Sequence, residues 1–503
     1  MLCDLPFEIF SEIVSYLSYK DILVLRQVTF SVHSSYCICL NASFIQILTH
    51  EDLCDATNAH VVWLNLAKEY VAENPHSHFS NTHLLSSLTT NQIRERFEKR
   101  LLVNHLWQSP GKVYPTTKRL KKPSPTLSSV AIAPGGRWLF AGTKHCSLYY
   151  WDLDSDDPEP VHLVPCDDVG NSPGENNTIT AIDFLVERDD PLSGFTLAFI
   201  GRDCHCEHKE SGEWLYIWDV IPQDASGTLK AKRLRTIPLP YYGLPSQFSF
   251  NGHLVACSMT KRLDVCWWRE CTETQLVRCT LVLETDPIIT SVYVIGSDKL
   301  LVYTRYQHNE HKAQLYTLEP EYSDVSEPGK AVSHATEIWS FCFCSQCHGY
   351  KTSRLYFDGA NYYQIIAMVD GIYSLTIPAS QADDAAATLT KVSNFNFHQR
   401  HHDTRIYGLG LSKGCCRVGA ELYRFGYSNA LTGGSYEHGV TFEAGIDRIL
   451  QRLDEVLSYD EELGRLISVT FGHLIIQDFS LPVYNPADVC PDSDAWTSSQ
   501  YWS

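Results

Sequence analysis

The stretch Leu215-Tyr216-Ile217-Trp218-Asp219 decides the fold of this 503-residue chain, because Tyr149-Tyr150-Trp151-Asp152 repeats its pattern. Short runs of β-branched and aromatic residues, bounded by Gly, Pro, Asn and Asp, are typical of β-strands. Around the earlier run, residues 127–153 contain three such strands, and Pro134-Gly135-Gly136 forms a turn between the first two. Residues 180–220 have the same organisation. The chain therefore contains a repeated antiparallel β unit.

Five further units continue this repeat toward the C-terminus. The strand ends fall near residues 152, 219, 267, 317, 375, 423 and 477, at intervals of 48 to 67 residues. A four-stranded antiparallel blade with its turns takes about 40 to 50 residues, so these intervals fit blades that carry some long loops. The sequence predicts a β-propeller of about seven blades, in which ring closure hides most strand edges. The alternative is a β-sandwich with an additional sheet.

The N-terminal residues have a helical pattern instead. Asp4 is a suitable helix cap, and Pro6 falls in the first turn, where a missing N–H costs little. Ser18-Tyr19-Lys20-Asp21 is a capping box that starts a second helix. Apolar residues recur at helical spacing in both segments: Ile9, Ile13, Tyr16, Leu17, Ile22, Leu25 and Val28. Two such short helices cannot bury their apolar faces alone, so they need a third helix or a partner protein.

The motif Leu5-Pro6, Glu8-Ile9, Tyr16-Leu17 and Asp21 resembles an F-box at these spacings. The resemblance implies docking to a Skp-type adaptor, which joins the protein to a cullin–RING ubiquitin ligase. It also implies which side chains dock to that adaptor. They are Leu5, Pro6, Ile9, Ile13, Leu17 and Leu25.

The chain departs from the F-box pattern after Val28. A third helix would follow directly in that family, with a tryptophan soon after, whereas the expected pattern resumes here only at residues 53–57 and reaches Val62-Trp63-Leu64. Residues 29–52 are therefore a possible insertion. Two explanations remain open: an intron retained in the gene model, or a surface loop, since the entropy cost of loop closure grows slowly with length.

An amphipathic helix is predicted for residues 91–107. Thr89-Thr90-Asn91-Gln92 is a capping box, and Ile93, Phe97, Leu101 and His105 follow at steps of four. Ser109-Pro110-Gly111 ends the helix. The predicted organisation is an F-box at 1–70, a linker and connector helix at 71–112, a propeller at 113–481 and a polar tail at 482–503. The fold class is thus α+β multidomain, with a small all-α F-box before the all-β propeller.

Composition limits the partners. Lys and Arg number 40 and Asp and Glu number 59, a net charge of −19, so nucleic acid is not expected as a partner. The basic run at residues 118–122 is interpreted as a solvated linker face. Asp4, Glu8 and Glu12 argue against a signal peptide, and no window is apolar enough to span a membrane. A cytoplasmic or nuclear protein is expected, with its 18 cysteines mostly reduced and packed as small apolar groups.

No cofactor or metal is expected, although two cysteine clusters were considered. Cys342, Cys344, Cys347 and His348 lie within seven residues, which would strain a closed zinc site, and haem attachment would need export. The second cluster is Cys204, Cys206 and His208. A run of histidines at His398, His401 and His402 is interpreted as a solvated loop. The sequence contains no nucleophile elbow, phosphate-binding glycine loop or metalloprotease pair.

The whole order of segments resembles F-box substrate receptors with a WD-type propeller. Trp151-Asp152 and Trp218-Asp219 fit that type, whereas Gly252-His253 and Gly472-His473 do not fall where its repeats place Gly-His. The resemblance implies a non-enzymatic substrate receptor of a cullin–RING ligase, whose propeller holds an unidentified target protein on one rim. The alternatives are an interaction scaffold without ligase role and a propeller-fold hydrolase.

Overall fold

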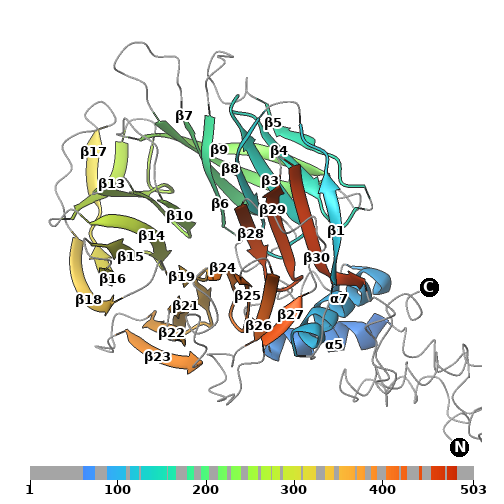
Figure 1. Ribbon diagram of the computed structural model, residues 1–503. Coiled ribbons are helices and arrows are strands. Elements are labelled where there is room, and N and C mark those ends of the chain that lie inside the picture. The colour runs from blue at the N-terminus through green and yellow to red at the C-terminus, as the bar shows by residue number, and fades with distance from the viewer. Residues whose placement is uncertain are drawn as a thin grey trace, which may run out of the picture. The chain divides into compact units, whose positions relative to one another are not determined.

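The computed structural model describes most of the chain after residue 59 (Figure 1). The described ranges are 60–73, 88–108, 114–123, 126–155, 157–165, 178–185, 194–202, 213–223, 228–239, 247–258, 262–272, 275–283, 287–306, 310–324, 335–344, 350–368, 371–379, 387–393, 404–418, 421–426, 441–444, 455–470 and 473–483. The chain divides into two compact units, one comprising Met1–His105 and Ser480–Ser503 and the other Leu106–Phe479. None of the described helices is long and apolar enough to cross a membrane.

The first unit contains two packed helices, α5 (His60–Glu73) and most of α7 (Thr90–Gln108). The capping box predicted for α7 is confirmed: Thr89 N donates to Gln92 Oε1 at 3.0 Å, and Gln92 N donates to Thr89 Oγ1 at 3.3 Å. Trp63 is fully buried and contacts Phe97 edge to face, with 6.1 Å between ring centroids. Phe97 also contacts Tyr70 in this way at 5.6 Å, so a shared apolar core holds the two helices together.

The second unit consists of antiparallel sheets, seven among the described residues, which we number as blades in chain order (Figure 1). Blade 1 contains β2 (Leu127–Ile132), β3 (Trp138–Thr143), β4 (Leu148–Asp152) and β5 (Val161–Val164). Blade 2 contains β6 (Thr178–Leu185), β7 (Phe195–Arg202), β8 (Glu213–Pro222) and β9 (Leu229–Leu239). Blade 3 contains β10 (Gln247–Asn251), β11 (Leu254–Ser258), β12 (Arg262–Trp267), β13 (Gln275–Val282) and a fifth strand, β17 (Glu321–Asp324).

The remaining blades follow the same plan. Blade 4 contains β14 (Ile288–Ile295), β15 (Lys299–Arg305), β16 (Glu310–Leu318) and β18 (Ala335–Cys344). Blade 5 contains β19 (Lys351–Thr352), β20 (Tyr356–Phe357), β21 (Asn361–Met368), β22 (Gly371–Pro378) and β23 (Thr388–Ser393). Blade 6 contains β24 (Thr404–Leu409), β25 (Lys413–Val418), β26 (Glu421–Gly426) and β27 (Thr441–Ala444). Blade 7 contains β28 (Glu455–Asp460), β29 (Arg465–Thr470), β30 (His473–Val483) and β1 (Tyr114–Leu120).

Burial follows the position of each strand in its blade. Every residue of β3 and of β11, the second strands of their blades, is buried, because neighbouring blades cover both faces of these strands. The outer strand β9 is instead exposed or half-buried along most of its length. The apolar runs that revealed the repeat in the sequence therefore belong to the strands in the middle of each blade.

Hydrogen bonds link consecutive blades around the ring. Ser128 Oγ in blade 1 donates to Ile179 O in blade 2 at 2.6 Å, and Phe250 N in blade 3 donates to Asp183 Oδ2 in blade 2 at 2.9 Å. Val294 N in blade 4 donates to Ser249 Oγ in blade 3 at 3.1 Å, and Tyr303 OH in blade 4 donates to Gln364 Oε1 in blade 5 at 2.6 Å. Leu411 N in blade 6 donates to Glu461 Oε2 in blade 7 at 2.7 Å, and Ile132 N in blade 1 donates to Ser458 Oγ in blade 7 at 3.3 Å. Blades 5 and 6 share a buried apolar cluster. The ring is closed, which is the architecture of a β-propeller.

Blade 7 is completed by the first strand of the propeller, β1, which pairs with β30 (Figure 1). This corrects one interpretation, because part of the basic run at residues 118–122 belongs to β1 and is not a solvated linker. Leu120 at the end of β1 is buried in a cluster with Leu139, Trp151 and Ile467. Lys118 and Arg119 can be charged because they lie on an outer strand that reaches solvent, whereas Leu120 holds that strand against the core.

The propeller prediction is confirmed, and the β-sandwich alternative is excluded by the closed ring. The strands predicted to end near residues 152, 219, 267, 317, 375, 423 and 477 lie in seven different sheets. They are the third strands of their blades, however, and not the last. The sequence interpretation missed the outer strands, such as β5 and β23, whose residues are largely exposed or half-buried.

Candidate functional site

The six residues predicted to dock the adaptor are Leu5, Pro6, Ile9, Ile13, Leu17 and Leu25, and all lie outside the described residues. The candidate site that the structure does describe is therefore on the propeller. Large apolar side chains are exposed mainly at blades 3 and 4. They are Val282, Ile288, Tyr322, Ile338 and Phe341, five of the eight such side chains among the described residues.

The outer strand of blade 4, β18, carries most of the candidate contact surface. It pairs with β16 from Ala335 to Cys344 with a bulge at Ile338, and it is the last strand of its sheet in the described part of the chain. Six of its residues are exposed, including Ile338 at 50% and Phe341 at 38%. An open apolar strand edge can add an extended segment of another protein by backbone hydrogen bonding.

Aromatic side chains form a ladder along one face of β18. The rings of Trp339 and Phe341 stack with centroids 6.4 Å apart, and those of Phe341 and Phe343 stack at 6.2 Å. Phe343 in turn stacks on His311 of β16 at 5.7 Å, with an angle of only 8° between the rings. Because alternate residues of a strand share a face, the sequence Trp339-Ser340-Phe341-Cys342-Phe343 places all three rings together. Within the ladder, the ring of Phe343 is buried and the ring of Phe341 is exposed.

The ring of His311, which stacks on Phe343 at one end of the ladder, is uncharged. Burial against Phe343 and Tyr350, together with the charge of Arg305, lowers the pKa of His311 below its usual value. The imidazole is therefore neutral at pH 7 and behaves as another flat ring in the stack.

Ionic and polar side chains border the ladder. Lys312 Nζ lies 3.2 Å from Glu337 Oε1, and Gln314 Nε2 donates to Glu337 Oε2 at 2.6 Å. Burial by itself would raise the pKa of Glu337, but these hydrogen bonds lower it, so the carboxylate stays charged. The surface thus has an apolar centre with a charged border, which is the composition of protein-binding surfaces.

Blade 3 shows the same kind of edge already occupied. The strand β17 comes from the connection between β16 and β18 in blade 4, yet it pairs with β13 of blade 3. Four residue pairs, from Gln275↔Asp324 to Arg278↔Glu321, form this antiparallel ladder. The chain therefore extends one blade with a segment of its neighbour, whereas β18 is the last described strand of its own sheet.

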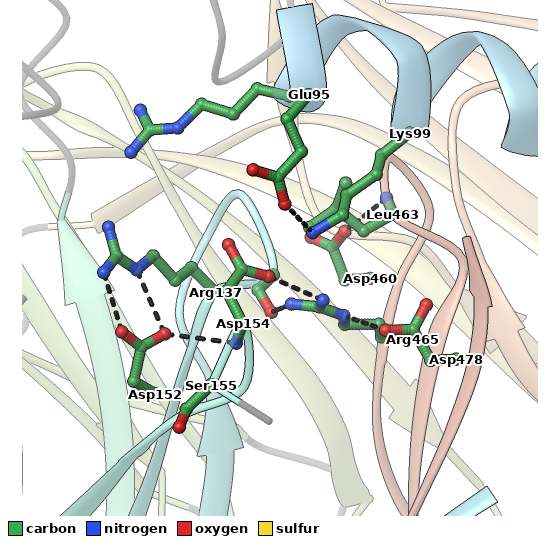
Figure 2. Close-up of polar contacts among 12 residues, drawn as sticks. Glu95, Lys99, Arg137, Asp152, Asp154, Ser155, Asp460, Leu463, Arg465 and Asp478 are labelled. Atoms are coloured by element: carbon green, nitrogen blue, oxygen red, sulfur yellow. Dashed lines mark hydrogen bonds and ion pairs between the residues drawn. The ribbon is translucent and has the colours of Figure 1, made fainter. Parts of the chain in front are cut away.

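A buried arginine fixes blade 7 to blade 1 (Figure 2). Arg465 donates from Nε to Asp478 Oδ2 at 2.9 Å, from Nη2 to Asp154 Oδ1 at 2.7 Å and from Nη1 to Gly136 O at 2.8 Å. Gly136 has φ of +74° and its Cα lies against Asp460, so a side chain there would be strained and would clash. Figure 2 shows Arg465 held between Asp154 and Asp478, so the ring presents its rims from a rigid scaffold.

The predicted cysteine clusters lie mostly outside the described residues. Cys204, Cys206, Cys347, His348 and the histidine run at 398–402 all lie there. Cys342 is an exposed free thiol on β18. Across the side chains that the structure describes, no group of three metal-ligating residues is present. Among the cysteines whose side chains the structure describes, seven are buried, and Cys342 is the exposed one.

Comparison with known proteins identifies the N-terminal segment. Residues 2–32 match the family model described as F-box domain, and this range includes all six predicted adaptor-docking residues. No curated protein sequence matches the chain.

Solved structures similar to the chain are WD40 and β-propeller proteins. The RRP9 WD40 repeats align at 9% identity with a TM-score of 0.38, covering 73% of this chain and 98% of that one. U3-55K aligns at 10% identity and a TM-score of 0.38, with coverages of 74% and 100%. The propeller domain of Myceliophteria thermophila Cps50 (Swd1) aligns at 14% and 0.37, with coverages of 72% and 99%. At such scores the fold assignment depends on the sheet topology described above.

The chain therefore combines an N-terminal segment that matches the F-box domain with a C-terminal β-propeller. Trp151-Asp152 and Trp218-Asp219 both lie on third strands, β4 and β8, in keeping with the WD-type resemblance.

Proposed function

We propose that this protein is the substrate receptor of a cullin–RING ubiquitin ligase. The observation that carries the proposal is the F-box match at residues 2–32 in the same chain as a closed propeller. The F-box docks a Skp-type adaptor through Leu5, Pro6, Ile9, Ile13, Leu17 and Leu25. The adaptor brings the cullin, and the propeller holds the target protein.

The mechanism needs no bond chemistry by this chain. Holding a target beside the ubiquitin-charged enzyme of the ligase raises the effective concentration of the reacting lysine and ubiquitin ester. A closed ring suits this role, because it presents the target on a surface of fixed shape. We place the protein in the cytoplasm or the nucleus, where these ligases act.

Co-purification with the adaptor tests this proposal. We expect the wild-type chain to retain a Skp-type adaptor and a cullin, and the double variant Leu5→Ala/Pro6→Ala to lose both, because truncation removes apolar contacts at the docking face. The matched control is Val161→Ala, an exposed apolar residue on β5 of the propeller, which leaves docking unchanged.

Two outcomes would contradict the ligase role. A wild-type chain that never retains adaptor removes it altogether. Adaptor without cullin favours the scaffold alternative, in which the F-box recruits the adaptor for another purpose.

For the target-binding surface we propose the edge of β18 with its aromatic ladder. Exposed Ile338 and Phe341 lie on the last described strand of this sheet, so an extended target segment can pair with the backbone and contact both side chains. Buried aromatic anchors commonly contribute most of the affinity of such contacts.

We expect Ile338→Asp/Phe341→Asp to remove most target-derived ubiquitin conjugates while leaving adaptor binding intact. Ubiquitin-remnant proteomics in cells that express each variant measures this. The matched control is Val161→Asp/Ile221→Asp, two exposed apolar residues on blades 1 and 2. An unchanged set of conjugates would move the target site to another part of the propeller.

A further inference from the structure

Two buried cysteines of blade 3 lie almost in bonding contact. Cys266, in β12, and Cys271, in the connection to β13, have their Sγ atoms 3.3 Å apart. A disulfide requires about 2.05 Å, so a shift of roughly 1.3 Å would join them. Both side chains are free thiols, 8% and 2% exposed.

The turn between the two cysteines is held firmly in place. Trp268 Nε1 donates to Gly252 O at 3.0 Å, and Trp268 N donates to His253 O at 3.0 Å, so the turn is fixed to the β10–β11 hairpin. Arg269 stacks over the Trp268 ring at 5.0 Å. Cys271 N donates to Trp267 O at 3.2 Å, which keeps Cys271 folded back over β12. The hydrogen-bonded turn therefore holds the two thiols next to each other.

The surroundings of the pair distinguish the two sulfurs. The Cys266 thiol and the Val277 amide, whose N lies 3.4 Å from Cys271 Sγ, both stabilise a thiolate at Cys271 and lower its pKa. The hydrogen bond to Cys271 and burial raise the pKa of Cys266. Cys271 is thus the nucleophile of the pair, and Cys266 is placed to react with it second.

The pair lies between the molecular surface and one small cavity. Cys271 is flanked by exposed Glu270 and Thr272 at the molecular surface. On the other side, Cys266 lines a cavity of about 20 Å³ whose walls include Asp264 and Arg278. This cavity is mostly apolar, and its volume is that of about one molecule of the size of water.

We propose that Cys266 and Cys271 form an oxidation site that closes to an intramolecular disulfide on reaction with a peroxide. The Cys271 thiolate attacks one peroxide oxygen, the O–O bond breaks, and Cys271 becomes a sulfenic acid as water leaves. The Cys266 sulfur then attacks the Cys271 sulfur, the S–O bond breaks, and a second water leaves. Two thiols and one hydrogen peroxide give one disulfide and two waters. The disulfide cross-links the two ends of the turn that carries Arg269 and Glu270, so oxidation makes this part of the blade stiffer.

Peptide mapping of the full-length protein tests the site directly. Trypsin cleaves after Arg269, between the two cysteines, so the disulfide links residues 263–269 to residues 270–278. After hydrogen peroxide treatment and alkylation we expect this linked peptide, lighter by two hydrogens than the sum of its free parts. Dithiothreitol should return it to two alkylated peptides.

Variants identify the order of reaction and provide the control. Cys266→Ser leaves Cys271 to accumulate as a sulfenic acid that dimedone labels, whereas Cys271→Ser gives no such label at Cys266. Cys279→Ser, on β13 one residue beyond Arg278, retains both thiols and should form the link as the wild type does. The wild-type map decides the matter without any variant: separate alkylated peptides after peroxide, or Cys271 linked to another cysteine, would overturn the proposal. The result is independent of adaptor docking.

Discussion

Arg465 shows how much of the ring closure depends on a single side chain. It is 1% exposed and joins a strand of blade 7 to a turn and a carboxylate of blade 1. A buried guanidinium is tolerated because Asp478 and Asp154 compensate its charge and Gly136 O accepts a further hydrogen bond.

We expect Arg465→Met to lower the free energy of unfolding by about 3 to 5 kcal/mol, since it leaves carboxylates without their buried partner. Urea unfolding measures this. The control is Arg137→Met, because the Arg137–Asp152 pair is 28% and 22% exposed, and its loss should cost about 1 kcal/mol or less. Equal costs for the two variants would show that Arg465 does not hold the closure.

At the residue scale the sequence did not reveal how the cysteines are arranged in space. Clusters such as Cys342, Cys344 and Cys347 attract notice because they are adjacent in the chain. Cys266 and Cys271 are five residues apart and meet only because a turn fixed by Trp268 returns the chain over β12. The partners of Arg465 are further still from it in sequence, and no local pattern marks them.

Among the elements, the short strand β1 completes the last blade of the ring. This seven-residue strand contributes the outer edge of blade 7, and Leu120 lies 3% exposed in a cluster shared by blades 1 and 7. The sequence could not reveal this, because a basic strand that pairs with β30 looks like a linker until its partner is known. Strands in the middle of a blade, such as β3, were predictable, since their apolar runs are visible without any partner.

Leu120→Ala should destabilise the protein by about 2 to 4 kcal/mol, because it leaves a cavity where the ring closes. Thermal unfolding and the rate of limited proteolysis near residue 114 report this loss. Ile221→Ala, which truncates a side chain that is 44% exposed on β8, should change stability by less than about 0.5 kcal/mol. If Leu120→Ala behaves like that control, β1 does not anchor the last blade.

The whole molecule combines two units with separate cores. The helices α5 and α7 share one apolar cluster around Trp63 and Phe97, and the blades of the propeller share others. The order of F-box and propeller could be predicted because each has a recognisable local pattern. The target could not, since the fold of a propeller does not specify what its rims bind.

Separate cores have a consequence for the adaptor-docking variant. Leu5→Ala/Pro6→Ala should leave the main unfolding transition of the propeller unchanged, because the substituted residues belong to the other unit. Differential scanning calorimetry measures this on the same preparations used for co-purification. A lowered transition would mean that lost docking reflects a misfolded chain.

The pairing of β1 with β30 also determines when the ring can close during biosynthesis. A ribosome releases β1 well before it has made β30, and at about 5 to 20 residues per second the interval is on the order of tens of seconds. During that time the nascent chain carries an incomplete circle whose first blade lacks its neighbour on one side. Chaperones that shield exposed strand edges would therefore be needed most just before translation ends, and a ribosome that stalls within the last blade would release an open, aggregation-prone product.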